Sequence, residues 1–239
     1  PSRQAAVIVA RGNHARGDLP EEPGSLEFLA LRDGQLTNIA TVAPNGGHGF
    51  GPRHLDFHPD GRWAAVSMER QNELQVFEML ADRFAPAPAH RVTTLDRPAH
   101  AGHDQLSGAL HFHPDGRTLY VINRHDSSVY GDGREPADAA SNNVAVYRFD
   151  AATGGPKLIQ HIATESVHVR TFSLDASATL LVTASILPAL WRHDGVVETV
   201  PARLTFFRIA SDGRLSLAAV RDMGGDRAAM FWSHLNGSM

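Results

Sequence analysis

The chain has 239 residues, of which 42% are hydrophobic and 20% charged, a composition typical of a globular protein with enough length for one large domain or two small ones. A net charge of -4 and a pI near 6.4 offer no basic surface to nucleic acid or to an anionic membrane. Cysteine is absent, so disulfide and thiolate chemistry are excluded. No apolar run is long enough to span a membrane, and no secretory signal opens the sequence. This favours a cytoplasmic location, although the first residue is Pro1 rather than Met and a preceding targeting segment stays open.

Short strands separated by loops are predicted along the whole chain. Apolar or alternating residues favour strands, Gly, Pro, Asn and Asp between them favour turns, and no stretch shows a helical period. The strands predicted in the N-terminal part are 5–10, 25–31, 36–42, 53–58, 63–68, 73–79 and 91–95. A polar loop over 11–24 and a glycine-rich loop over 46–51 interrupt them.

One six-residue pattern recurs along the chain. Phe-His-Pro-Asp-Gly-Arg at 57–62 returns unchanged at 112–117 and in degenerate form at 174–179. Pro-Asp-Gly favours a tight turn, because Pro fixes φ, Asp caps its own backbone and Gly accepts a left-handed conformation. Each copy is followed by an apolar strand and later by an amphipathic one, at 63–66 and 74–77, 118–122 and 144–147, and 180–182 and 204–207. Four short strands per unit predict an all-β fold, a β-propeller of four-stranded blades; a β-sandwich with coincidentally similar turns is the alternative.

The predicted units form one domain over residues 1–239. They occupy 5–43, 53–96, 108–162 and 170–221, and a single strand at 230–235 follows them. A lone C-terminal strand closes a propeller ring when the N-terminal part of the chain supplies the rest of its blade. We therefore expect about four blades plus a closing strand here, with further N-terminal blades preceding Pro1.

Several stretches resemble one known family. The run Gly51–Arg62 (Gly-Pro-Arg-His, then His-Pro-Asp-Gly-Arg), with Glu69 after the next strand, resembles the lactonase family of seven-bladed propellers, that of propeller-type 6-phosphogluconolactonases and carboxymuconate-lactonising enzymes. Residues 107–124, with their Asn-Arg ending, resemble the next blade of that family. Residues 169–175 resemble a later Pro-Arg-x-Phe element, with Val in place of Pro, and 224–235 resemble the closing strand.

The chain also departs from that family pattern. The loops 125–142 and 186–202 are longer than the family pattern predicts, and the N-terminal blades are missing. A family histidine on an earlier blade has no match here, which leaves the catalytic set incomplete.

Propeller topology places two strand ends on one rim. The first strand of a blade starts at this rim and the second strand returns to it, so Arg53 and Glu69 should share a face. Aligning the repeats makes Arg53, Gly108 and Arg170 equivalent, which directs two arginines toward the same rim with room between them. The loops on this face are long and polar, and they carry His48, His100, His103, Asp104 and His168. Function is expected on this looped face.

The residues on this rim suit lactone hydrolysis, which needs an activated water and a stabilised oxyanion. Arginine pairs bind carboxylate or phosphate, because a guanidinium donates to two oxygens at once. Arg53 or Arg170 could supply the positive charge, and Glu69 or His54 the general base. Glu69 could instead hold an arginine in place, or form a purely structural salt bridge with Arg53. The family resemblance points independently to Arg53, Glu69 and Arg170.

Further residues are predicted to contact the substrate: His48, His103, Asn123, Arg124 and His168. His100, His103 and Asp104 also fit a zinc or manganese motif. A merely polar loop explains them more simply, and the resemblance implies no metal, so neither a metal nor a cofactor is expected. His58 and His113 lie next to the turns of the opposite face, where they should satisfy backbone groups.

The predicted function is that of a hydrolase, a lactonase acting on a small anionic sugar-type lactone such as a phosphogluconolactone. One alternative is a lactonising cycloisomerase that uses the same arginines on a carboxymuconate-like dicarboxylate. The other is a non-catalytic propeller that binds a ligand or partner on its looped face. The expected partner is the small anionic lactone, with no nucleic acid and no membrane; the sequence does not determine the oligomeric state.

Overall fold

Antiparallel strands make up most of the computed structural model, which describes residues 5–15, 17–81, 83–96, 105–125, 136–138, 142–193 and 195–224. Across these ranges the only helical segment is a single 3₁₀ turn, Pro44–Gly47. None of the described helical segments is long and apolar enough to cross a membrane. The all-β prediction is confirmed.

Four sheets follow one another along the chain, and we call them blades one to four. Their strands, in order across each sheet, are β1 (Ala5–Ala10), β2 (Ser25–Arg32) and β3 (Gln35–Val42); β4 (Pro52–Phe57), β5 (Trp63–Met68), β6 (Glu73–Glu78) and β7 (His90–Thr93); β8 (Gln105–Phe112), β9 (Thr118–His125), β11 (Asn143–Asp150) and β12 (Gly155–Ala163); and β13 (Val169–Leu174), β14 (Leu180–Ser185), β17 (Arg203–Ile209) and β18 (Leu215–Asp222). Blades two to four are the predicted four-stranded units. Blade one has three strands among the described residues.

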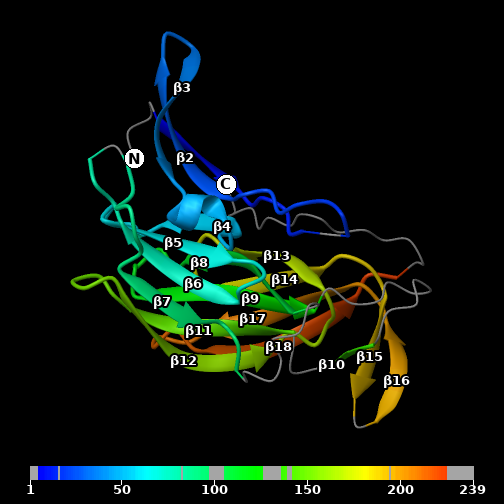
Figure 1. Ribbon diagram of the computed structural model, residues 1–239. Coiled ribbons are helices and arrows are strands. Elements are labelled where there is room, and N and C mark those ends of the chain that lie inside the picture. Colours follow the sequence, from blue (N-terminus) through cyan, green and yellow to red (C-terminus); the bar gives the residue numbers. More distant parts are fainter. Residues whose placement is uncertain are drawn as a thin grey trace.

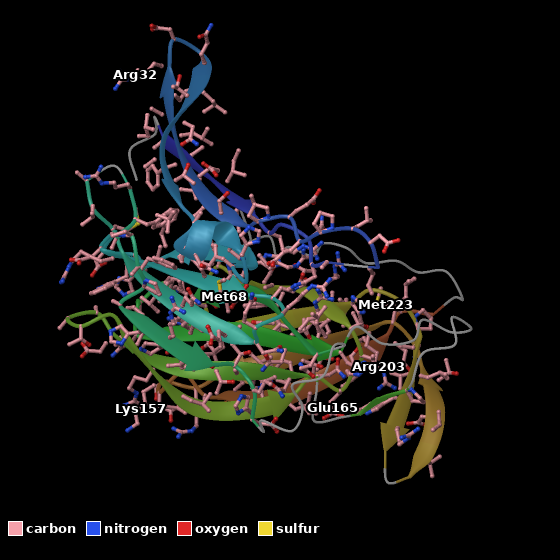
Figure 2. All side chains as sticks on the ribbon, viewed as in Figure 1. Arg32, Met68, Lys157, Glu165, Arg203 and Met223 are labelled. Atoms are coloured by element: carbon pink, nitrogen blue, oxygen red, sulfur yellow. The ribbon has the colours of Figure 1, made fainter. Side chains whose placement is uncertain are left out.

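The blades are layered in chain order. Figure 1 shows the strands of blades two (cyan), three (green) and four (yellow to orange) gathered in one stacked body, while the hairpin of β2 and β3 projects away from it. Figure 2 shows Met68 within the stacked body and Arg32 at the far tip of that hairpin. This stacking of small antiparallel sheets is the arrangement of propeller blades.

The hydrophobic core lies between the blades, because each central strand is buried on both faces. On β5, Ala64, Val66 and Met68 pack toward blade one, whereas Trp63 and Ala65 pack toward blade three. On β9, the even-numbered Tyr120 and Ile122 join the core with blade four, and their odd-numbered neighbours Leu119 and Val121 join the core with blade two. Strands buried on both faces need continuous apolar runs, which explains why these strands lack polar alternation.

The long loops of blades three and four contain a small extra sheet, and the prediction of loops there was wrong. Strands β15 (Ala189–His193) and β16 (Val196–Val200) form a hairpin, and β10 (Ala137–Asp138) pairs with β15. Ala189, Trp191 and Val200 pack against Val167, so the hairpin has a hydrophobic cluster of its own. Alternating apolar residues around Gly195 are the sequence signal for this hairpin. The predicted closing strand, 230–235, lies outside the described residues.

The repeated turns form one end of the blades, which we call the turn face: residues 58–62, 113–117 and 175–179. His58 Nδ1 accepts a hydrogen bond from the Asp60 amide at 3.2 Å, and its Nε2 lies 2.9 Å from the Gly116 carbonyl of the next blade. His113 repeats this pattern one blade further on, with Nε2 3.0 Å from the Ala178 carbonyl. The prediction that these histidines satisfy turn backbone groups is confirmed, and they also join neighbouring blades.

Candidate active site

A β-bulge interrupts the first strand of three blades at the same place. The register between β4 and β5 skips Arg53, that between β8 and β9 skips Gly108 and Ala109, and that between β13 and β14 skips Arg170. A bulge re-aims a side chain out of the regular alternation and is common beside active sites. The three positions that the repeat alignment matched are therefore structurally equivalent.

Glu69 is the centre of an ion-pair cluster at this end of the blades. It follows β5 directly, and its side chain is only 2% exposed. Its Oε1 lies 2.8 Å from Arg53 Nε and 2.7 Å from Arg124 Nη2, and its Oε2 accepts a hydrogen bond from Arg11 Nη1 at 2.7 Å. Arg11, Arg53, Arg124 and Arg170 together are called the arginine rim below.

The neighbouring guanidinium groups favour the ionised form of the Glu69 carboxyl group. Burial alone would raise the pKa of Glu69, but the hydrogen bond from Arg11 and the charges of Arg53 and Arg124 hold it below its usual value. Both carboxylate oxygens are engaged by guanidinium groups. Of the three roles predicted for Glu69, this geometry suits the holding of arginines or a structural salt bridge better than the removal of a proton.

Arg124 and His168 extend the cluster toward blade four. Arg124 is 3% exposed and lies beside Gly108, where a Cβ would stand 3.6 Å from Arg124 Nε, an ordinary contact distance. Arg124 Nη1 lies 2.8 Å from His168 Nε2, and Arg170 Nη1 lies 3.4 Å from the same nitrogen. Guanidinium groups only donate, so this nitrogen accepts and His168 is neutral with its proton on Nδ1.

The cluster consequently has two layers. Glu69, Arg124 and His168 are buried and connect the blades, whereas Arg11, Arg53, His54 and Arg170 retain exposure. The structure brings all four predicted catalytic residues to this end of the blades: Arg53, His54, Glu69 and Arg170.

His54 differs from the three arginines of the exposed layer, because its side chain is uncharged near pH 7. Burial first, and then the charges of Arg53 and Arg124, lower the pKa of His54 to about 4. The imidazole is therefore uncharged near pH 7 and can accept a proton. No hydrogen bond to its ring occurs within the described part of the chain, which leaves it available to a ligand or a water.

The residues predicted to bind substrate lie in different places. Arg124 and His168 are internal connectors, as described above. Asn123 is fully buried, and its amide donates to the Thr94 carbonyl at 2.5 Å and to Asn143 Oδ1 at 2.9 Å, so it joins strands and blades. His48 is 55% exposed on the glycine-rich loop, 3.5 Å from Glu21. His103 lies outside the described residues, as do His100 and Asp104 of the alternative metal motif. The described residues hold no group of three or more His, Cys, Asp or Glu side chains that could bind a metal ion.

Arg11 was missed in the sequence prediction. It is the first residue after β1, as Glu69 is the first after β5, so the topological rule that selected Glu69 also selects Arg11. It also lines a small polar cleft, open to solvent and with a cavity volume of only ≈ 10 Å³, that reaches Glu69 and Arg70. The sequence signal for Arg11 was therefore its place directly after the predicted strand 5–10, to which the rule was not applied.

The fold and this cluster define a β-propeller with a cationic site at one end of its blades. A model of the family described as "Lactonase, 7-bladed beta-propeller" matches residues 28–185, and the chain belongs to that family.

Curated relatives of the chain include two bacterial 6-phosphogluconolactonases. That of Bacillus subtilis is 28% identical over 160 residues, which cover 65% of this chain and 39% of the relative. That of Erwinia tasmaniensis is 26% identical over 158 residues, covering 66% and 42%. The chain thus spans less than half the length of these relatives.

Solved structures support the propeller fold. A protein from Lactobacillus plantarum superposes with a TM-score of 0.62 at 22% identity, over 93% of this chain and 56% of that one. The periplasmic gluconolactonase of Pseudomonas aeruginosa superposes with a TM-score of 0.57 at 17% identity, over 94% and 69%.

Proposed function

We propose that this chain carries the active-site part of a lactonase that hydrolyses a small, anionic, sugar-type lactone. The observation that carries the proposal is the ion-pair cluster, in which one buried carboxylate, Glu69, contacts three guanidinium groups from three blades. With Arg170 nearby, the arginine rim has more positive than negative charge. Such a site favours a ligand that brings negative charge or develops it in the transition state.

The reaction is assigned to the exposed layer of the site. Neutral His54 accepts a proton from a water whose oxygen attacks the lactone carbonyl carbon. Negative charge then develops on the carbonyl oxygen, where Arg53 and Arg170 stabilise it. The ring C–O bond breaks, the ring oxygen takes up the proton from His54, and the product is an open-chain hydroxy acid. Its new carboxyl group releases the second proton of the water to solvent and becomes a carboxylate.

Glu69 has a positioning role in this scheme. Its two oxygens fix the guanidinium groups of Arg53 and Arg11 on either side of one carboxylate. Preorganised charges of this kind lower a barrier because they need no reorientation during the reaction. The names of the curated relatives support the choice of a sugar lactone, such as 6-phosphogluconolactone, over other cyclic esters.

Lactone hydrolysis by the full-length protein tests the proposal, with the release of acid followed in weakly buffered solution. Arg53→Ala and Arg170→Ala should each lower kcat/KM about 100-fold, in keeping with the loss of one charge-stabilising donor. Arg208→Ala is the matched control, because Arg208 is exposed on β17 and outside the arginine rim. Unchanged rates in both rim variants would contradict the proposal. Turnover of a carboxymuconate-like dicarboxylate alone would favour the cycloisomerase, and binding without turnover the non-catalytic propeller.

A further inference from the structure

The loop after β1 holds Arg11 in a fixed position. Gly12 has φ +67°, and a Cβ at this position would stand 2.3 Å from the Glu22 carbonyl oxygen. Only glycine therefore allows the two ends of the loop to meet. They do so in a β-bridge between Asn13 and Glu22, whose side chains are also hydrogen-bonded. The backbone of Arg11 is thus set by the loop itself, independently of Glu69.

The guanidinium of Arg11 is oriented but incompletely buried. It donates to Glu69 Oε2 at 2.7 Å through Nη1 and to Asn13 Oδ1 at 3.1 Å through Nη2. Its side chain is 38% exposed, compared with 23% for Arg53 and 3% for Arg124 on the same carboxylate. A guanidinium has five N–H donors, so an oriented and exposed Arg11 has donors to offer a ligand.

The cleft around Arg11 carries charged groups of both signs. The cleft that Arg11 lines also contains His14, Glu69 and Arg70. Two further carboxylates of the cleft are already engaged: Glu21 accepts from the Gly49 amide at 2.7 Å and lies by His48, and Glu22 accepts from Asn13. Burial first, and then the charge of Arg70, lower the pKa of His14. Because hydrogen bonds engage these carboxylates, the exposed donors of Arg11 are the groups that the cleft offers to an anion.

We propose that Arg11 is a specificity-determining residue that binds a second anionic group of the substrate, of the phosphate-ester class, remote from the lactone ring. Arg11 and Arg53 contact different oxygens of Glu69, so this carboxylate fixes the separation between the guanidinium that binds the remote group and the guanidinium that serves the lactone. The planar fork of arginine suits phosphate, which it can bind through two oxygens. This inference rests on the lactonase activity proposed above, and it adds a residue from blade one to the site.

The test compares two lactones in Arg11→Gln and in the parent protein. The loss of kcat/KM on 6-phosphogluconolactone should be at least tenfold larger than the loss on neutral gluconolactone, and it should reside mainly in KM, because a hydrogen-bonded charge pair with the substrate has been removed. Arg11→Lys should recover part of this difference. Arg32→Gln, at the exposed tip of the β2–β3 hairpin, is the matched control on the same sheet.

The outcomes separate this inference from the proposed function. If the parent protein hydrolyses both lactones and Arg11→Gln reduces both rates equally, Arg11 serves only the structure and the inference is overturned. If the parent protein hydrolyses neither lactone, the proposed function fails. In that case, calorimetry measures the binding of inorganic phosphate to the parent protein and to Arg11→Gln. Weaker binding by Arg11→Gln supports an anion site at Arg11, and unchanged binding overturns it.

Discussion

The two ends of the blades are built from the same strands, yet they follow different rules. At the turn face, blades two and three use the same six residues, and each histidine reaches the next turn in the same way. At the arginine rim, equivalent positions differ: the bulges carry Arg53, Gly108 and Arg170. The end that repeats joins neighbouring blades, and the end that varies brings unlike side chains together. Variation at equivalent positions is therefore why we expect the function at the arginine rim rather than at the turn face.

The largest effect is expected at the rim, from Glu69→Gln. The amide keeps the shape but removes the charge, and it leaves the buried Arg124 beside a neutral group. Breaking a buried ion pair in this way costs about 3–5 kcal/mol of unfolding free energy, and displaced guanidiniums should lower kcat/KM about 100-fold or more. Urea unfolding and lactone hydrolysis measure the two effects. Glu78→Gln, on the exposed end of β6, is the control; wild-type activity in Glu69→Gln would show that Glu69 does not organise the site.

The turn face should respond in stability alone, and Gly116→Ala tests this. Gly116 has φ +72°, and a Cβ there would stand 2.5 Å from His58 Nε2, so alanine meets both backbone strain and a collision between blades. We expect a loss of about 2–4 kcal/mol of unfolding free energy with kcat/KM of the folded fraction retained.

Gly61→Ala is the matched control for Gly116→Ala. Gly61 occupies the same turn position with φ +75°, but its Cβ would meet nothing within 4 Å. It should therefore show only the backbone cost, about 1–2 kcal/mol. Equal losses in the two variants would contradict the role assigned to the histidine contact between blades.

The pH dependence of stability should distinguish the arginine rim from the turn face by a smaller effect, which arises from His54. The pKa of His54 is about 4 in the folded chain against an ordinary value of 6.5, so the unfolded chain binds more protons between these values. The contribution of His54 to stability is complete above about pH 6.5 and is lost as the pH falls toward 4. Urea midpoints between pH 7.5 and 4.5 should fall less steeply in His54→Gln than in the parent protein. Parallel curves would contradict the assigned pKa.

The smallest expected effect is a gain, from Ala178→Gly in the degenerate third turn. Ala178 takes the glycine position of the repeat with φ +53°, a conformation that disfavours a side chain. Glycine relieves this strain, and the greater flexibility of the unfolded chain offsets part of the gain. We expect an increase of about 0.5 kcal/mol in unfolding free energy with unchanged kcat/KM, measured by urea unfolding. A loss of stability would show that the alanine methyl packs more favourably than the strained turn costs.

Much of the fold was predictable because it rests on local patterns. Pro-Asp-Gly specifies a turn without tertiary help, and its recurrence with matched strands fixed the blade pattern and the equivalence of Arg53 with Arg170. The hairpin of β15 and β16 was missed although Gly195 and its flanking apolar residues carried the signal, because the family pattern had labelled that stretch a loop.

The candidate site was only partly predictable, because its contacts join distant residues. Sequence and topology identified Arg53, His54, Glu69 and Arg170 as sharing one rim. They did not distinguish exposed residues from buried ones: Asn123, Arg124 and His168 are internal, and only packing between blades decides this.

The sequence by itself determined the blades, since turn chemistry and strand period are properties of a few adjacent residues. The tertiary structure alone decided which charges meet. Glu69 joins Arg11, Arg53 and Arg124 because three strand ends from three blades converge on one rim, and ion pairing depends on distance in space and on burial, neither of which a residue's neighbours in the chain specify.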